Sequence, residues 1–182
     1  ALVSMAKWST RNYALISLLG ESGCRAGEAA RLRISDLNLK DCTAMVDGKG
    51  NKRREIMFTQ ETAIALREWL TKRPGDTDHD CVFTSTRGHG PLSTRSVSAV
   101  VYRLGKRAGV AEPFGAHALR HRVGTKLARN HVPVRVAQAY LGHSSPEITF
   151  GYYQDVDESD LRAAAKLLRP TTLKELFSPD SS

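Results

Sequence analysis

The stretch His117-Ala118-Leu119-Arg120-His121 carries the strongest structural signal in this chain of 182 residues. Its two histidines and its arginine stand at positions i, i+3 and i+4, which places them on one side of a helix or of its first turn. Apolar residues occupy the adjacent side and would bury it, namely Leu119, Val123 and Leu127. A zincin-type metal site needs a glutamate directly after the first histidine, and alanine stands there instead. The stretch therefore predicts a packed helix that presents an arginine and two histidines without a metal.

Three further stretches carry reactive side chains: residues 23–28 (GCRAGE) with Arg25 and Glu28, residues 48–52 (GKGNK) with Lys49, and residues 141–143 (LGH) with His143. Tyr152 follows nine residues after that histidine. Taken alone and in this order, the groups fit an exposed helical ion pair, a solvated hairpin tip, a histidine at a helix terminus and a core tyrosine. The glycines at 20, 23 and 27 weaken the first explanation, because glycine forms helices poorly and allows close backbone approach.

Taken together, the same groups meet the needs of one reaction, the transfer of a phosphodiester through a tyrosine. Cleavage places negative charge on nonbridging oxygens, and planar guanidiniums bind such oxygens in bidentate fashion. A tyrosine hydroxyl has an ordinary pKa near 10, so its attack at neutral pH needs a base or strong positive charge. The departing sugar oxygen needs a proton, which a lysine or histidine supplies. The sequence shows no acidic cluster for Mg²⁺, so the arginines and the lysine must supply the positive field, and we expect no metal and no cofactor.

The charge distribution agrees with a polyanionic partner. The chain has a net charge of +8 and a pI of about 9.7. From Asp155 onward six acidic residues face four basic ones, which leaves +10 on the preceding 154 residues and −2 on the tail. A basic body with a mildly acidic end favours a polyanion as the partner of the body. A soluble protein with a cationic surface would show the same balance, so charge alone leaves both interpretations open.

The cysteines and the hydropathy pattern indicate the setting in which the chain works. Cys24, Cys42 and Cys81 lack CxxC spacing, so neither a disulfide framework nor a zinc site is indicated, and a reduced, cytoplasmic setting is the simplest expectation. No apolar run approaches the roughly 20 residues of a membrane span, and the start does not resemble a signal peptide. Because the chain begins with Ala1 rather than methionine, we expect a fragment of a longer protein.

Periodicity predicts an α+β domain that is predominantly helical with a small antiparallel sheet. Two strands are expected at 43–47 and 55–58, around a polar loop at 48–54. Helices are expected from Ser9 or Thr10 to the glycines at 20–23, at 26–32, around 64–70, from a cap at Ser93 to before Gly109, at 118–130, at 134–141, and from Pro146 toward Tyr152. A last apolar stripe comprises Leu161, Ala164, Ala165 and Leu168. We expect one domain over residues 1–170 and a loosely ordered or docking tail over 171–182.

The order and spacing of these stretches resemble the catalytic domain of the tyrosine recombinases, the phage integrase family, over about residues 7–168. The resemblance implies the fold of that catalytic domain. It also implies site-specific DNA recombination, the reaction by which integrases move mobile genetic elements. Arg25 and Arg120 would clamp the scissile phosphate, Glu28 would support the clamp, and His117 would belong to the same phosphate site.

The resemblance further implies a covalent mechanism. Lys49 would protonate the 5′ oxygen, and His143 would donate a hydrogen bond to the scissile phosphate. Tyr152 would form a 3′-phosphotyrosyl link and free a 5′ hydroxyl, and rejoining would need neither metal nor ATP. His121 would brace the site. The nine-residue interval favours Tyr152 as nucleophile over Tyr153, and only one of two adjacent helical tyrosines can face the phosphate.

Partners follow from the same resemblance. Double-stranded DNA would be bound by Lys52, Arg53, Arg54 and Arg122. The full-length protein would act as a homotetramer on DNA, associated with the bacterial nucleoid, and could exchange its C-terminal helix between subunits. The stripe from Leu161 to Leu168 is a candidate for that helix, with packing on its own core as the alternative. The family's N-terminal DNA-binding domain is absent from this chain, so we expect weak, salt-sensitive DNA binding and little complete recombination.

Two other functions use similar residues. A type IB topoisomerase shares the arginine, lysine, histidine and tyrosine chemistry, but it fits the hairpin at 48–50 and the stretch 141–143 less well. A non-catalytic DNA-binding module would need neither His117 nor Tyr152. The target sequence and the direction of the reaction depend on groove contacts that residue types do not fix.

Overall fold

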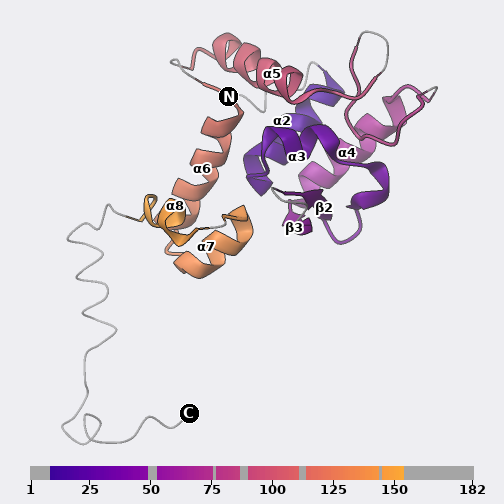
Figure 1. Ribbon diagram of the computed structural model, residues 1–182. Coiled ribbons are helices and arrows are strands. Elements are labelled where there is room, and N and C mark those ends of the chain that lie inside the picture. The colour runs from indigo at the N-terminus through magenta and orange to yellow at the C-terminus, as the bar shows by residue number, and fades with distance from the viewer. Residues whose placement is uncertain are drawn as a thin grey trace, which may run out of the picture.

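The computed structural model describes residues 9–48, 53–75, 77–86, 90–110, 114–143 and 145–153. One three-stranded antiparallel sheet, in the order β1-β2-β3, accompanies a larger set of helices (Figure 1). The expected class, mainly helical α+β with a small antiparallel sheet, is confirmed. In chain order the elements are α2 (Thr10–Ser22), α3 (Ala26–Arg31), η1 (Ile34–Asp36), β1 (Leu37–Asn38), β2 (Thr43–Asp47), β3 (Arg53–Met57), α4 (Gln60–Lys72), α5 (Thr94–Arg107), α6 (Ala116–Arg129), α7 (Val134–Leu141) and α8 (Pro146–Phe150).

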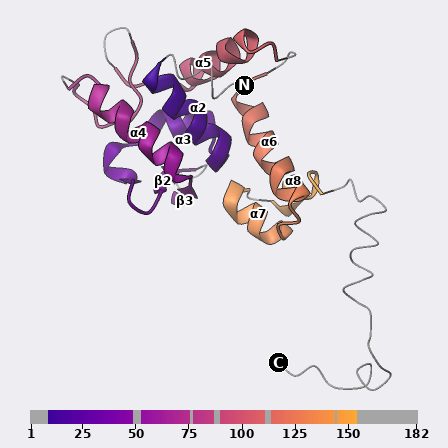
Figure 2. The ribbon, with the colours of Figure 1, turned by 180° about the vertical axis from the view of Figure 1, so that it is seen from behind.

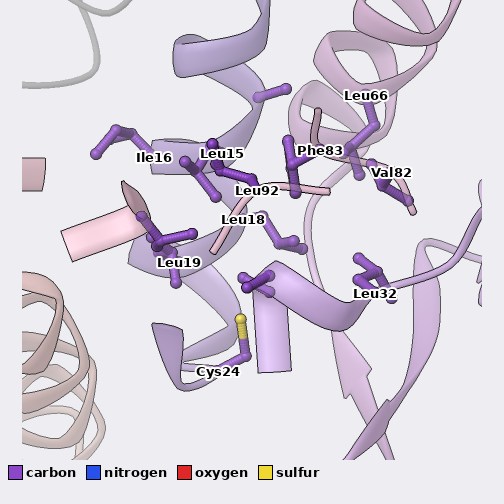
Figure 3. Packing of buried hydrophobic residues seen from close by; sticks show 14 of the residues in the cluster. Leu15, Ile16, Leu18, Leu19, Cys24, Leu32, Leu66, Val82, Phe83 and Leu92 are labelled. Carbon is purple, nitrogen blue, oxygen red and sulfur yellow. The ribbon is translucent and has the colours of Figure 1, made fainter. Parts of the chain in front are cut away.

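Helix α2 lies at the centre of the core. Leu15, Leu18 and Leu19 are fully buried, and burial of each such side chain contributes roughly 1.5–3 kcal/mol. The helix packs against both α4 and α6, and Figure 3 shows its leucines among other core side chains, including Phe83. It ends at Gly23, whose φ of 61° is left-handed, and a Cβ there would lie 2.8 Å from Leu141 Cδ2. The glycine therefore ends α2 and lets α7 approach closely.

The sheet carries the hairpin that the sequence predicts. Strand β2 has the expected bounds, but β3 begins at Arg53 rather than at Glu55. Arg53 pairs with Asp47 and Arg54 with Val46, so both arginines belong to the ladder and not to the loop. The expected bounds were wrong because charged residues were assigned to the loop, whereas pairing with β2 extends the strand over them. The two-residue β1 was not predicted at all, being too short for a periodic signal.

Most helix bounds follow the local signals in the sequence. Ser93 caps α5, since its hydroxyl accepts a hydrogen bond from the Ser96 amide at 3.1 Å. Pro133 separates α6 from α7, and Pro146 occupies the first turn of α8. These predictions are confirmed to within two residues. The expected stripe from Leu161 to Leu168 lies outside the described residues.

The described elements form two groups that meet at a junction. Figures 1 and 2 show α6, α7 and α8 on one side, and α2, α3, α4 and the sheet on the other. Contacts of α2 with α6, and of α5 with both α3 and α6, hold the groups together. Within the described ranges, no helix is long and apolar enough to cross a membrane. The reactive side chains of three of the four sequence stretches, Arg25, Arg120 and His143 among them, come together at this junction, and Lys49 of the fourth lies outside the described residues.

Candidate active site

Arg25 and Glu28 form the start of helix α3. Arg25 is the N-cap residue, and its amide donates to Glu28 Oε2 at 2.7 Å while its Nη1 donates to Oε1 at 2.9 Å. The Glu28 side chain is only 2% exposed, whereas that of Arg25 is 43% exposed. The pair therefore differs from a solvated ion pair on a helix surface. A buried carboxylate holds the backbone and one edge of the arginine, and the remaining Nη2 reaches the Gly142 carbonyl oxygen at 3.3 Å.

Arg120 is a buried cation with one uncommitted donor group. Its Nη1 donates to the Gly23 carbonyl oxygen at 2.6 Å, while Nη2 is buried and has no hydrogen-bond partner among the described residues. Burial, followed by the nearby Arg25, lowers the pKa of Arg120 to about 10, so the guanidinium still carries its charge at neutral pH. A buried, charged donor without a partner is costly unless an anion occupies the adjacent space.

A cleft of about 470 Å³ lies beside these two arginines. Its lining includes both of them together with Glu28, and His117 from the first turn of α6, where the imidazole is exposed. Four further polar lining residues were missed from the sequence: Arg31, Asp47, Thr94 and Ser98. Arg31 lies one turn after Glu28 on α3, and the two hydroxyl residues begin α5, but sequence periodicity does not show which helix ends meet.

His143 is buried directly after the end of α7. Gly142 ends that helix with a φ of 65°, and the imidazole Nδ1 lies 2.9 Å from Thr149 Oγ1. Burial and then the cations Arg120 and Arg25 lower the pKa of His143 to about 4, so the ring is neutral at pH 7. His143 thus follows a helix end, as the sequence suggests, but it is buried and lies against Thr149. In the tautomer in which Thr149 donates to Nδ1, the other ring nitrogen carries the hydrogen and can donate.

Tyr152 and Tyr153 lie in the turn after α8, and their hydroxyl groups go to different places. The Tyr152 ring lies between two imidazoles, with centroids 5.0 Å from His121 and 6.1 Å from His143, and it is nearly parallel to the second. It rests on Gly124 of α6, where a Cβ would lie 2.7 Å from Tyr152 Cζ. The Tyr153 hydroxyl instead donates to the Val132 carbonyl oxygen at 2.6 Å, and burial raises its pKa. Of the two hydroxyl groups, that of Tyr153 is engaged with the backbone, and the choice of Tyr152 as nucleophile stays a prediction.

The basic residues expected to bind DNA are placed differently from one another. Lys49 and Lys52 lie outside the described residues. Arg53 is on the exposed face of β3, paired with Asp36 and Asp47, and Arg122 is exposed on α6. Arg54 turns inward, since its Nη2 donates to Glu28 Oε2 at 2.9 Å. Strand alternation with the buried Ile56 is the sequence signal that predicts this inward orientation.

Electrostatically, the site is a cluster of cations around one acid. Arg25 and Arg54 both pair with Glu28, and Arg120 lies close enough to all three for their charges to alter its pKa. Three arginines against one glutamate leave an excess of positive charge beside the cleft, and its lining adds one more arginine, Arg31, and one more acid, Asp47. Such preorganised donors stabilise the negative charge that develops on phosphate oxygens. Among the described residues, no group of three or more histidine, cysteine or acidic side chains is arranged to hold a metal ion.

Fold and site define the class of tyrosine recombinase catalytic domains. The chain belongs to the phage integrase family, whose model matches residues 1–160. It is 37% identical over 140 residues to the tyrosine recombinase XerC of Haemophilus ducreyi, a match that covers 76% of this chain and 46% of that protein. The chain spans about half the length of the curated relatives it matches.

Solved structures agree with this assignment. The crystal structure of XerA recombinase matches with a TM-score of 0.78 and 35% identity, over 94% of this chain and 62% of that one. The XerH site-specific recombinase bound to its difH substrate, in a pre-cleavage complex, matches with a TM-score of 0.78 and 27% identity, over 93% of this chain and 52% of that one. Both support the recognition of the family from its four sequence stretches.

Proposed function

We propose that this chain is the catalytic domain of a site-specific DNA recombinase that cleaves and rejoins strands through a 3′-phosphotyrosyl link. The main observation is the buried Arg120, which has an Nη2 without a hydrogen-bond partner among the described residues and which lines a cleft together with Arg25. A scissile phosphate between the two guanidiniums would satisfy that donor and receive charge-assisted hydrogen bonds on its nonbridging oxygens. The DNA-bound state of the similar XerH recombinase supports duplex DNA as the ligand.

In the cleavage step, Tyr152 Oη attacks phosphorus and the bond from phosphorus to the 5′ oxygen breaks. The hydroxyl proton of Tyr152 passes to His117, and Lys49 gives a proton to the departing 5′ oxygen. His143, neutral and held by Thr149, donates to a phosphate oxygen. Religation reverses these transfers when a 5′ hydroxyl attacks the phosphotyrosine. The link retains the energy of the broken bond, so the cycle consumes no ATP, and the arginines supply the positive field without a cofactor.

The proposal extends to the assembly. We place one catalytic domain over residues 1–170, acting on double-stranded DNA in the bacterial cytoplasm as part of a longer protein that forms a homotetramer. The C-terminal segment with Leu161 and Leu168 is proposed to dock on a neighbouring subunit. These statements rest on the family relationship and on the basic charge of the body.

A suicide-substrate selection tests the reaction without knowledge of the target sequence. The chain is incubated with a pool of nicked duplexes that carry random bases around the nick, because diffusion of the short cleaved product traps the covalent intermediate. Adducts are isolated on a denaturing gel and their DNA is sequenced. We expect an adduct with the wild-type chain and with Tyr153→Phe, and none with Tyr152→Phe.

Each other outcome has a defined meaning. Absence of any wild-type adduct would contradict strand cleavage by this chain. An adduct that survives Tyr152→Phe but is lost in Tyr153→Phe would move the nucleophile by one position. Relaxation of supercoiled plasmid without sequence selection would favour a type IB topoisomerase instead.

A further inference from the structure

Arg54 is a largely buried guanidinium to which the proposed reaction assigns no step. It pairs with Val46 across the hairpin, and strand alternation directs it to the same face as the buried Ile56. Its side chain is 16% exposed, compared with 51% for the neighbouring Arg53. An arginine held at this depth must obtain its partners from the protein.

Those partners belong to two segments that lie far from Arg54 in the sequence. Nη2 donates to Glu28 Oε2 at 2.9 Å, and Nη1 donates to the Tyr140 carbonyl oxygen at 3.1 Å, near the end of α7. The side chain also lies directly against Gly142, where any Cβ would collide with it. This one side chain therefore links β3, to which it belongs, with α3 and the end of α7.

Both contacts lead to groups that hold the proposed scissile phosphate. Glu28 is the carboxylate that fixes Arg25, and Gly142 provides the carbonyl oxygen that accepts a hydrogen bond from Arg25 Nη2. His143 follows directly after Gly142. Arg54 thus fixes Glu28 and Gly142, the two partners of Arg25, relative to each other. It also fixes the start of the segment that carries His143.

The hydrogen bonding of Arg54 is incomplete, so stabilisation of the fold does not fully explain its position. Its Nε is buried and has no hydrogen-bond partner among the described residues, and an unsatisfied buried donor costs stability. A buried ion pair is in general weak evidence for stability, because desolvation offsets the attraction between the charges. The contacts of Arg54 are better explained by their effect on geometry, because they fix the position of α3 relative to α7.

We propose that Arg54 is a positioning residue for the phosphate clamp: by binding Glu28 and the end of α7 together, it sets Arg25 and His143 in the geometry that cleavage requires. This inference rests on the proposed function. It concerns a residue that does not itself touch the DNA, and it differs from the loop contact with DNA that the sequence predicts for Arg54.

The test measures single-turnover adduct formation by Arg54→Lys on the duplex that the wild-type chain selects. Lysine keeps the charge beside Glu28 but lacks the planar fork that reaches the Tyr140 carbonyl oxygen as well. We expect the maximal cleavage rate to fall by about 100-fold, the scale of a misplaced catalytic group, with the half-saturating DNA concentration nearly unchanged. Arg73→Lys is the matched control, because Arg73 also makes several protein hydrogen bonds, but to Thr77, His79 and Cys81 and not to Glu28 or the end of α7. It should leave the rate unchanged.

A second substrate identifies the step that Arg54 supports. In a duplex with a bridging 5′-phosphorothiolate the sulfur leaves without needing a proton, so a defect in Lys49 would be relieved. A defect in Arg25 and His143, which bind the nonbridging oxygens, would remain. We expect Lys49→Ala to be rescued on this substrate and Arg54→Lys not to be rescued. Rescue of Arg54→Lys would overturn the proposal, since the residue would then act through the hairpin lysine.

The remaining outcomes are separable. A wild-type chain that forms no adduct refutes the proposed function, whereas an Arg54→Lys chain that cleaves at the wild-type rate refutes only the present inference. If Arg54→Lys fails to fold, the double substitution Glu28→Gln and Arg54→Met removes both buried charges, and Arg25→Gln provides a clamp-deficient reference. We expect the folded double variant to cleave as slowly as that reference. Normal cleavage by the double variant would overturn the proposal.

Discussion

At the scale of single residues, burial changes the chemistry of groups that look ordinary in the sequence. Arg120 keeps its charge in a buried position with one donor free, and His143 loses its charge although it follows a helix end. Residue types and spacing predict which side chains belong to the site. They do not predict the protonation of His143 or the partners of Arg54, because both depend on segments that meet only in the folded chain.

The buried His143 gives folding a defined dependence on pH. Its pKa is about 4 in the folded chain against about 6.5 when unfolded. Below pH 6.5 the unfolded state therefore binds more protons, and the free energy of unfolding should decrease as the pH falls from about 6.5 to about 4. Urea unfolding at several pH values measures this slope. His143→Gln should have a shallower slope in the same window, and an equal slope in both chains would contradict the assignment.

At the scale of elements, helices follow local signals, whereas the sheet follows them for β2 but not for β1 or the start of β3. Ser93 and Pro146 mark helix starts by chemistry that acts within one turn, so the sequence predicts them well. The start of β3 depends on pairing between Arg53 and Asp47, and the two residues of β1 depend on pairing with β2. Cross-strand partners of this kind cannot be read from a local window.

Helix α6 allows a test of the surface on which the Tyr152 ring packs. Gly124→Ala removes a poor helix former and should stabilise the helix by up to about 1 kcal/mol, less any strain from the new contact. Its methyl group would lie 2.7 Å from Tyr152 Cζ, so the ring must move. We expect adduct formation to slow while the melting temperature is maintained. Gly20→Ala on α2 is the control, because no atom lies within 4 Å of its new Cβ.

The two glycine variants must therefore differ in activity and not in fold. Equal cleavage rates for Gly124→Ala and Gly20→Ala would show that the position of Tyr152 on α6 is irrelevant to the reaction. If Gly124→Ala fails to fold while Gly20→Ala folds, the Tyr152 ring has no alternative position beside the new methyl group.

At the scale of the whole molecule, the site exists only where two groups of helices meet. Arg25 comes from the group that contains the sheet, and His143 and Tyr152 come from the group of α6, α7 and α8 (Figure 1). The four sequence stretches predict which residues form the site, but not which helices bring them together. Arg31, Thr94 and Ser98 were not predicted, because they line the cleft only through the packing of α3 against α5.

The overall charge predicts how the chain binds DNA. With a net charge of +8, most affinity should come from phosphate contacts, and the logarithm of the binding constant should fall by about 0.9 for each neutralised phosphate per tenfold increase in salt. Fluorescence anisotropy with a labelled duplex measures this slope. Arg122→Gln should reduce it by about one contact. Arg67→Gln, an exposed change on α4 away from the cleft, should not, and tight binding that is insensitive to salt would contradict the expectation.

The hydrogen bond from Tyr153 to Val132 has a mechanical consequence. It fixes the chain immediately after Tyr152 to the connection between α6 and α7, while the contact between His143 and Thr149 fixes the segment before it. A displacement of the chain from its C-terminal side would therefore have to break the hydrogen bond of Tyr153 before it moved the Tyr152 ring away from His143 and Gly124.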